Sequence, residues 1–541
     1  MIDTLSKKKT DKIFSIGPLS EVLIATAFSM LFTALYAIFA GQDINWDQRN
    51  YHIYSVYAWI SNTTHWHIAP GQIQSWFNPL GYVLHYFAVQ HFQPVIAGAF
   101  IGSLAGLNGG VIYTLVRNLI DGPVWFARSI GILCTIISLS ASQFLSETGT
   151  TFIDNFVSIP TLIAVTLLAV CSVKKQNIRN LLLIYLISGF LFGAAAGLKL
   201  TMLIYAVAGA TTLIILWRSL RLEPSIFIGF TVGIGIGYLA TGGFWAIELW
   251  QEYKSPLFPF YNAIFHSPYY EQTNFSARHF APNGLLDAIS YPFQWLIGKQ
   301  PAAQVPIRDG RLATFLLLLV IVTLHTIKSK TAEHESQTIN VLAQKFLLTF
   351  FFVSFAVWIS MFAIHRYFIP GELLIGILLF ICIDRLVANY KGKVITLVLL
   401  TLFFLVHTEV SNWGRIPYGN SWYGMETQVA NDAPSTIVML GHPLHPYSYI
   451  VPFFPNTRFI RINSNINIDP NRGLGAKAKA VIERSETVAI VTPSKLSDLD
   501  RRKLDQFGLR IDESQCKELT NRIDRFFVCP AVHVGPKGSE N

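Results

Sequence analysis

Apolar runs about as long as a membrane-spanning helix, which needs roughly 20 residues, follow one another along most of the chain. Eleven runs meet this requirement: 19–40, 94–118, 130–146, 155–173, 181–198, 201–217, 226–250, 312–327, 346–364, 367–387 and 394–409. Such a chain cannot fold around a single water-soluble core. The pattern predicts an α-helical polytopic membrane protein with about 11 transmembrane helices.

The charge composition supports the same fold class. Of 541 residues, 52% are hydrophobic and 13% are charged, whereas soluble domains carry about 25% charged residues. The net charge of +9 could suggest a nucleic-acid partner. However, the basic residues cluster in short loops between apolar runs, as the positive-inside rule produces, and no nucleic-acid-binding motif accompanies them. We therefore expect no nucleic acid among the partners.

The basic loops also predict an orientation. Lys7, Lys8, Lys9 and Lys12 precede the first apolar run, which is too long for a signal peptide and lacks a cleavage site. We expect an uncleaved first helix with a cytoplasmic N-terminus and a C-terminus on the outer side. The segment 181–217 has basic residues on both flanks, so it must hold an even number of helices. Its turn therefore places Lys199 at the outer face.

Two long outer segments and a polar tail complete the predicted organisation. Residues 1–411 form the transmembrane module, with outer loops at 41–93 and 251–311. Residues 412–541 alternate short apolar runs with helix-like stretches, which predicts a small α/β domain outside the cytoplasm. Cys516 and Cys529 lie in this tail, and we expect them to form a disulfide if it faces an oxidising compartment.

The first outer loop carries two carboxylates, Asp43 and Asp47, four residues apart. A helical start would place them on one face together with Tyr51. A carboxylate in a partly water-excluded site can remove a proton from an attacking hydroxyl. The alternative is structural, since Asp47 could cap the helix that follows it.

A second acidic pair, Glu147 and Asp154, follows the third apolar run. Asp154 could instead cap the next helix, and Glu147 could be a solvated loop charge. Lys199 either snorkels to the interface or clamps a phosphate. His365 and Arg366 stand between two late spans, where an outer arginine requires an anionic partner, either a carboxylate or a phosphate.

Aromatic and amide residues in the two outer loops are candidates for a substrate groove, because aromatic rings stack on sugar faces. These candidates are Tyr51, His52, Asn78, Tyr261 and Asn262. Membrane-belt packing is the alternative for the aromatic residues. The sequence has no Walker A, GxGxxG, HExxH or GxSxG motif, which argues against a nucleotide-driven pump or a zinc hydrolase.

The chain resembles the GT-C superfamily of integral-membrane glycosyltransferases. The resemblance rests on the acidic first outer loop (Asp43, Asp47), the juxtamembrane segment after it, the second acidic loop (Glu147, Asp154), the pair Arg366-Tyr367 and the outer C-terminal domain. The chain also resembles a group of bacterial predicted membrane proteins of this type, through Trp46-Asp47-x-Arg49-Asn50-Tyr51-His52, Phe77-Asn78-Pro79, Gly197-Leu198-Lys199-Leu200-Thr201 and Pro256-Leu-Phe-Pro259.

The resemblance implies transfer of a sugar from a polyprenyl-phosphate donor to an acceptor hydroxyl, with inversion, at the outer face of the bacterial cytoplasmic membrane. Asp47 or Asp43 would be the general base. Lys199 and Arg366, with His365 beside them, would bind the donor phosphate. The acceptor could be a glycan, a lipid or a protein, and no cofactor is certain, although a divalent metal is left open. Two other classes stay open: a transporter of polyprenyl lipids or anions, and a non-catalytic envelope scaffold.

Overall fold

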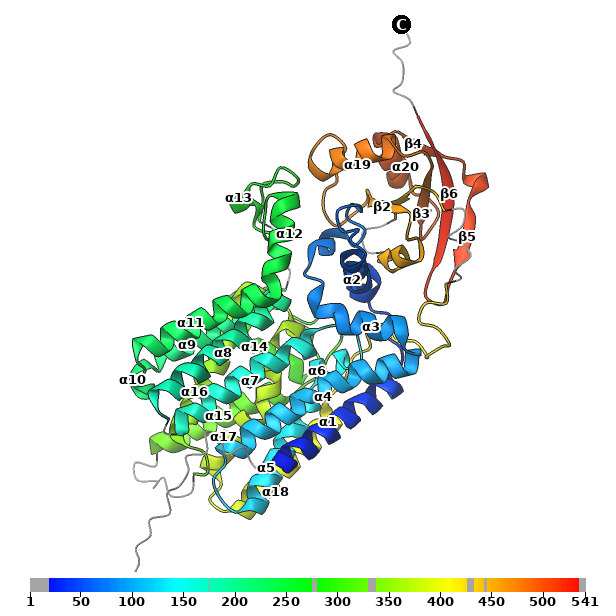
Figure 1. Cartoon of the computed structure of the whole chain (residues 1–541). Helices are drawn as coiled ribbons and strands as arrows, with labels where there is room; N and C mark the ends of the chain where they lie inside the picture. The colour runs from blue at the N-terminus through cyan, green and yellow to red at the C-terminus, as the bar shows by residue number, and fades with distance from the viewer. Residues whose placement is uncertain are drawn as a thin grey trace, which may run out of the picture.

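The structure is a computed structural model that describes residues 19–174, 176–274, 280–328, 337–425, 433–441 and 445–534. Lys7, Lys8, Lys9 and Lys12, on which the predicted orientation rests, lie outside these residues. A slanted bundle of helices forms one part of the molecule, and a domain built on a β-sheet sits at one end of it (Figure 1).

Helices account for most of the bundle and its connections. They are α1 Leu19–Ala40, α2 Ile53–Ile60, α3 Val83–His91, α4 Pro94–Leu119, α5 Val124–Leu139, α6 Ser142–Glu147, α7 Asp154–Val173, α8 Ile178–Leu198, α9 Leu203–Ile215, α10 Trp217–Leu220, α11 Pro224–Tyr238, α12 Phe244–Tyr253, α13 Asn262–Phe265, α14 Leu285–Leu296, α15 Arg311–Lys328, α16 Val341–Met361, α17 Ile369–Leu386 and α18 Tyr390–His407.

Within the described ranges, eight helices are long and apolar enough to cross a membrane, and three shorter apolar helices cover 124–139, 200–215 and 311–327. Together they overlap all eleven runs predicted from the sequence. The chain is therefore a multi-pass helical membrane protein. The predicted run 226–250 is part of one continuous 30-residue helical stretch, Pro224–Tyr253, interrupted by a π-helical turn at Leu239–Gly243.

The predicted span 130–146 is wrong in its boundaries, because the structure divides it into α5 and the short α6. The guanidinium of Arg311 explains the break. It donates to the carbonyl oxygens of Ile137 and Ser140, at 2.9 and 2.7 Å, so a side chain satisfies these two carbonyl groups at the end of α5. The chain turns there and restarts as α6, whose last residue is Glu147.

The C-terminal part contains a six-stranded mixed sheet, which confirms the predicted α/β domain. The strands are β1 Thr436–Met439, β2 Arg458–Arg461, β3 Val488–Thr492, β4 Leu509–Ile511, β5 Lys517–Thr520 and β6 Arg525–His533. Their order is β2-β1-β3-β6-β4, with β5 paired to β6. The β2-β1-β3 part is parallel, and β6 is antiparallel to its neighbours.

The two faces of this sheet have different partners, since successive side chains of a strand point to opposite faces. Val438 of β1 belongs to a core shared with α19 (Gly473–Glu483) and α20 (Asp498–Gln506). Ile437 and Met439 belong to another core, shared with α2 and the 3₁₀ segment Ser448–Phe453. The first loop thus packs directly against the C-terminal domain, above α3 in Figure 1.

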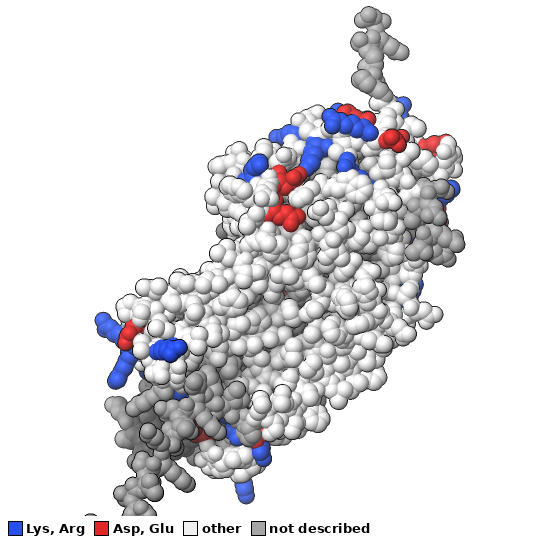
Figure 2. All heavy atoms as spheres, viewed as in Figure 1, with Lys and Arg blue, Asp and Glu red and all other residues white. Residues whose placement is uncertain are grey.

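Charged side chains gather at the two ends of the molecule, and the visible face between them is almost free of them (Figure 2). At the end that holds the start of α1, Glu21 pairs with Arg117 and Arg128. Lys393 and Asp384 form a fully buried pair between α18 and α17. The almost uncharged visible face between the two ends fits the hydrocarbon layer of a membrane.

Candidate active site

Two ion pairs lie where four segments far apart in the sequence meet, at the bundle end that faces the sheet domain. Arg366 donates to the carboxylate of Asp47 at 2.6 Å. Lys199, just after α8, donates to both carboxylate oxygens of Asp154, at the start of α7, at 2.6 Å. All four side chains are largely buried. We call these four residues together with Glu147 the charged site.

These contacts decide several structural alternatives. Asp47 makes no side-chain cap bond although it precedes the π-helical turn Gln48–His52. Asp154 is the first residue of α7, and no side chain caps that helix. The capping interpretations are therefore wrong for both. Lys199 does not snorkel to an interface, because Asp154 holds its ammonium group.

Glu147 brings a third carboxylate to the charged site. Its side chain is 1% exposed, so it is not the solvated loop charge considered above. Gln143 donates to one carboxylate oxygen at 2.9 Å, while the other oxygen is buried without a hydrogen-bond partner. Burial, reinforced by the nearby Asp154 carboxylate, raises the pKa of Glu147 well above its usual range. This environment favours the protonated form of Glu147.

Aromatic rings line the charged site. The ammonium of Lys199 lies 4.9 Å from the centre of the Tyr367 ring, and the guanidinium of Arg366 lies 5.3 Å from the same centre. Arg366 also stacks over Phe152, at 4.7 Å. One tyrosine ring thus connects the two cations. The Nε of Arg366 is buried without a hydrogen-bond partner, so the guanidinium retains unused donor capacity.

Tyr51 and His52, predicted for a substrate groove, lie beside this site. The Tyr51 ring packs edge-on against Tyr82, and His52 stacks on Tyr82 with ring centres 4.4 Å apart. Burial raises the pKa of Tyr51, and the Asp47 charge adds to this effect. Burial lowers the pKa of His52 well below its usual range, with Lys199 as the next contributor, so His52 is neutral at pH 7.

Asp43 is buried close to the same loop but in a different environment. Its carboxylate accepts hydrogen bonds from the backbone N–H and side-chain amide of Asn45, and from the backbone N–H and hydroxyl of Thr151, all between 2.8 and 3.0 Å. These bonds tie the first loop to the segment between Glu147 and Asp154. Asp43 and Asp47 therefore differ in role: Asp43 joins two loops, and Asp47 faces Arg366.

His365 turns away from the charged site, although its neighbour Arg366 belongs to it. Its ring stacks on Trp295, with centres 4.3 Å apart, and its Nε2 lies 3.9 Å from Glu372. It lines a small buried cavity together with Asp309 and Arg311. We call Asp309, Arg311, His365 and Glu372 the capping cluster, because its two carboxylates accept hydrogen bonds from the first backbone N–H groups of α6. The structure thus separates His365 from Lys199 and Arg366, with which it was grouped as a phosphate ligand.

Two of the three remaining groove candidates donate hydrogen bonds to backbone carbonyl oxygens, and the third is exposed. Asn78 donates to the carbonyl oxygens of Gly197 and Thr241, at 2.7 and 2.8 Å. Asn262 donates to three carbonyl oxygens of its own loop. Tyr261 is 40% exposed beside α13. Among the described residues, no bond or ring contact joins these three to the charged site.

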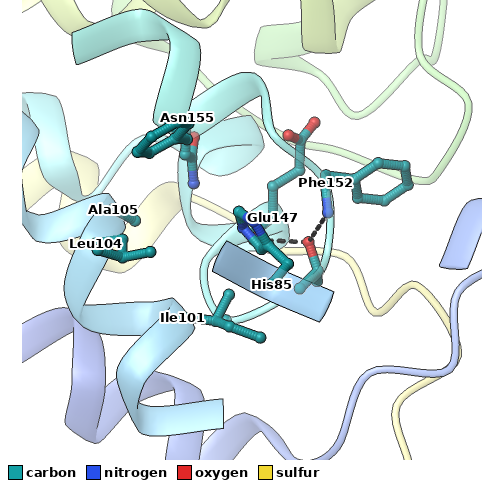
Figure 3. A pocket seen from close by; sticks show the side chains of 10 residues that line it. His85, Ile101, Leu104, Ala105, Glu147, Phe152 and Asn155 are labelled. Atoms are coloured by element: carbon teal, nitrogen blue, oxygen red, sulfur yellow. Dashed lines mark hydrogen bonds between the residues drawn. The ribbon is translucent and has the colours of Figure 1, made fainter. Parts of the chain in front are cut away.

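A small pocket borders Glu147 on its other side. His85, Asn155 and the apolar residues Ile101, Leu104 and Ala105 line it. The carboxylate of Glu147 extends away from His85, and its backbone carbonyl accepts a bond from Thr150 (Figure 3). The charges of Lys199 and Arg366 act on this carboxylate and partly offset the rise of its pKa.

The charged site does not fit a metal ion. Within the described part of the chain, no three Asp, Glu, His or Cys side chains form a group that could hold one. Arg366 and Lys199 bond carboxylate oxygens of Asp47 and Asp154, which a cation would need.

Several residues of the site were missed from the sequence. Phe152, Thr151 and Tyr82 lie in the same outer segments as the predicted residues, but their spacing gives no signal of a site. Asp309, Arg311 and Glu372, which belong to the capping cluster and not to the charged site, do carry a usable signal, because charged residues inside or beside an apolar run are costly and require partners. In the C-terminal domain the structure links Cys516 to Cys529 by a disulfide, as the sequence predicts.

Comparison with solved structures identifies the fold of the chain. The crystal structure of ArnT from Cupriavidus metallidurans bound to undecaprenyl phosphate matches 97% of this chain and 100% of that chain, with a TM-score of 0.52 and 11% identity. An Archaeoglobus fulgidus oligosaccharyltransferase matches 88% of this chain and 69% of that chain, with a TM-score of 0.45 and 12% identity. No family model and no curated protein sequence matches. The chain has the GT-C fold.

Proposed function

We propose that this GT-C protein transfers a sugar from a polyprenyl-phosphate-linked donor to an acceptor hydroxyl at the outer face of the cytoplasmic membrane. One observation carries the proposal: Lys199 and Arg366 lie on one tyrosine ring, in a buried site that also holds three carboxylates. Such a site can bind an anionic donor and remove a proton from an acceptor. The undecaprenyl phosphate bound to the ArnT structure supports a lipid-linked donor.

In this mechanism the donor phosphate competes with the carboxylates for the two cations. Arg366 binds phosphate bidentately through its planar guanidinium, and Lys199 supplies a second point charge. When the phosphate binds Arg366, the Asp47 carboxylate loses its 2.6 Å partner and becomes able to accept a proton. Donor binding thereby produces the free base.

The transfer step is a direct displacement at the anomeric carbon. The acceptor oxygen forms a bond to that carbon and passes its proton to Asp47, while the bond from the carbon to the phosphate oxygen breaks. The bonding electrons stay with the polyprenyl phosphate, whose added charge Lys199 and Arg366 stabilise. A single displacement inverts the anomeric configuration. Glu147, in its protonated form, is placed to donate a hydrogen bond within the site.

The same proposal assigns the membrane orientation. The charged site and the sheet domain would face the outer side, and the end with Glu21, Arg117 and Arg128 would face the cytoplasm, where short basic loops accumulate. Tyr51, His52 and Tyr82 would line the sugar or acceptor side of the site.

The deciding experiment measures transfer of radiolabelled sugar from a panel of polyprenyl-phosphate sugars by the purified full-length chain. We expect transfer by the wild type and its loss in Asp47→Asn. The control variant Glu518→Gln changes an exposed residue of the C-terminal domain and should transfer at the wild-type rate. If the folded protein binds polyprenyl phosphate but transfers no sugar from any donor, a transport function replaces this proposal. If it binds neither donor nor lipid, a scaffold function does.

A further inference from the structure

Hydrogen bonds link the turn of the β5–β6 hairpin to the first loop. Asp524, in the turn between these strands, accepts a hydrogen bond from Arg49 at 2.8 Å. Arg522, two residues earlier, donates to the side chain of Gln42 at 2.9 Å. The contacted residues, Gln42 and Arg49, enclose the segment that holds Asp43 and Asp47. These partners lie 475 and 480 positions apart in the sequence.

The turn is itself held rigidly. The side chain of Asn521 accepts bonds from the backbone N–H groups of Ile523 and Asp524, both at 2.8 Å. The second carboxylate oxygen of Asp524 accepts a bond from Tyr449, also at 2.8 Å. Tyr449 is fully buried. Hydrogen bonds within the C-terminal domain thus fix the position of Asp524, the residue that pairs with Arg49.

The disulfide closes the other end of the hairpin. Cys516 immediately precedes β5, and Cys529 lies in β6 next to Val528, which pairs with Lys517. The covalent link limits how far the two strands can separate at their open end. The hairpin is therefore held at its open end by the disulfide and at its turn by hydrogen bonds, and the turn binds Arg49.

The contacted segment needs such support. Asp47 is followed at once by the π-helical turn Gln48–His52, a form that is rare and concentrated at functional sites. The side-chain amide of Gln48 is buried without a hydrogen-bond partner. Contacts with other parts of the molecule therefore hold this backbone in place. One of them is the ion pair between Arg49 and Asp524 of the C-terminal domain.

We propose that the turn Asn521–Asp524 is a clamp that positions Asp47, with Asp524 and Arg522 as positioning residues for the transfer reaction. This inference rests on the proposed function for its kinetic consequence, but its structural part is independent of it. The clamp gives the C-terminal domain a role in the reaction without any contact to the reacting atoms.

The test compares hydrogen exchange of the full-length wild type with Asp524→Asn and with Arg522→Gln/Asp524→Asn. Backbone amides of residues 42–52 should exchange about tenfold faster or more in the double variant, because a local opening replaces a held segment. The matched control is Glu518→Gln/Arg525→Gln, which removes an exposed ion pair of the same hairpin. Its exchange in residues 42–52 should equal that of the wild type.

Kinetics provide the second readout. A displaced base is expected to lower kcat by about 10- to 100-fold, with an unchanged KM for the donor. The swap Arg49→Asp/Asp524→Arg should recover part of this loss, and Cys516→Ser/Cys529→Ser should accelerate exchange first at the turn and then at residues 42–49. Unchanged exchange at residues 42–52 in a folded double variant would overturn the clamp. An inactive wild type would instead overturn the proposed function, while the exchange result would still decide the clamp.

Discussion

The charged site and the capping cluster both bury acids next to bases, yet their hydrogen bonds differ in kind. In the capping cluster, Glu372 accepts from the backbone N–H groups of Gln143 and Phe144, and Asp309 accepts from that of Ser142. Arg311 donates to backbone carbonyls at the end of α5. These charged side chains bond the backbone groups on both sides of the break between α5 and α6, so their arrangement has a structural explanation.

In the charged site the carboxylates of Asp47 and Asp154 are bonded by side-chain cations, and no described backbone N–H donates to either of them. One oxygen of Glu147 and the Nε of Arg366 have no hydrogen-bond partner. A buried ion pair contributes little to the free energy of folding. A buried polar atom without a hydrogen-bond partner lowers the stability of the folded state. The comparison teaches that the partners of a buried charge, more than its burial, separate a candidate reaction site from a structural one.

The largest expected effect separates Asp47 from Asp43. Asp47→Asn removes the proposed base and should lower kcat by about 10²- to 10⁴-fold. Asp43→Asn should mainly lower thermal stability, because an amide cannot accept all the hydrogen bonds from Asn45 and Thr151. Transfer assays and thermal unfolding in detergent measure both. The distinction between the two aspartates collapses if Asp43→Asn retains its melting temperature and loses transfer.

The capping cluster should respond to substitution through stability. Arg311→Met leaves Asp309 as a buried carboxylate without its cation, which typically costs about 3–5 kcal/mol. We expect a lower unfolding temperature, with donor binding by the folded fraction retained. Arg308→Gln, which removes the exposed pair with Glu409, is the control and should change the unfolding temperature little. A large loss of donor affinity in folded Arg311→Met would place this cluster in the binding site.

The Lys199–Asp154 pair tests the same comparison from the other side. Lys199→Met alone buries an unpaired carboxylate, whereas Lys199→Met/Asp154→Leu removes both charges and should recover most of the stability. If Lys199 binds donor phosphate, the double variant stays impaired, with kcat/KM for the donor reduced by about 10²- to 10³-fold. Recovery of transfer together with stability would assign the pair to structure alone.

The effect that is smallest near neutral pH concerns the contact between the first loop and the sheet domain. Burial lowers the pKa of His67 to about 3, and its Nδ1 accepts a bond from the backbone N–H of Phe459. The unfolded chain takes up this proton near pH 6.5, so the folded state loses stability as the pH falls from about 6.5 toward 3, by up to about 1.4 kcal/mol per pH unit. His67→Asn should flatten the slope of unfolding temperature against pH. An unchanged slope would remove His67 as its cause.

More of the fold than of the candidate site could be predicted from the sequence. Apolar runs report spanning helices directly, because a bilayer requires a minimum length of apolar helix, and every predicted run overlaps an observed helix. The break inside 130–146 could not be predicted, since it depends on Arg311, which lies about 170 positions later. A local cause separates His365 from Arg366: the two are neighbours in the sequence, but adjacent residues of a 3₁₀ turn point in different directions.

What the sequence determined by itself was therefore local: which segments enter the membrane, which short loops are basic, and which ionisable residues stand at helix ends. The tertiary structure alone decided which of those residues meet. Asp47 and Arg366 lie 319 positions apart, and Asp154 and Lys199 lie 45 apart. No periodicity records such a distance, because pairing of buried charges is set by how helices pack, and packing is a property of the whole chain.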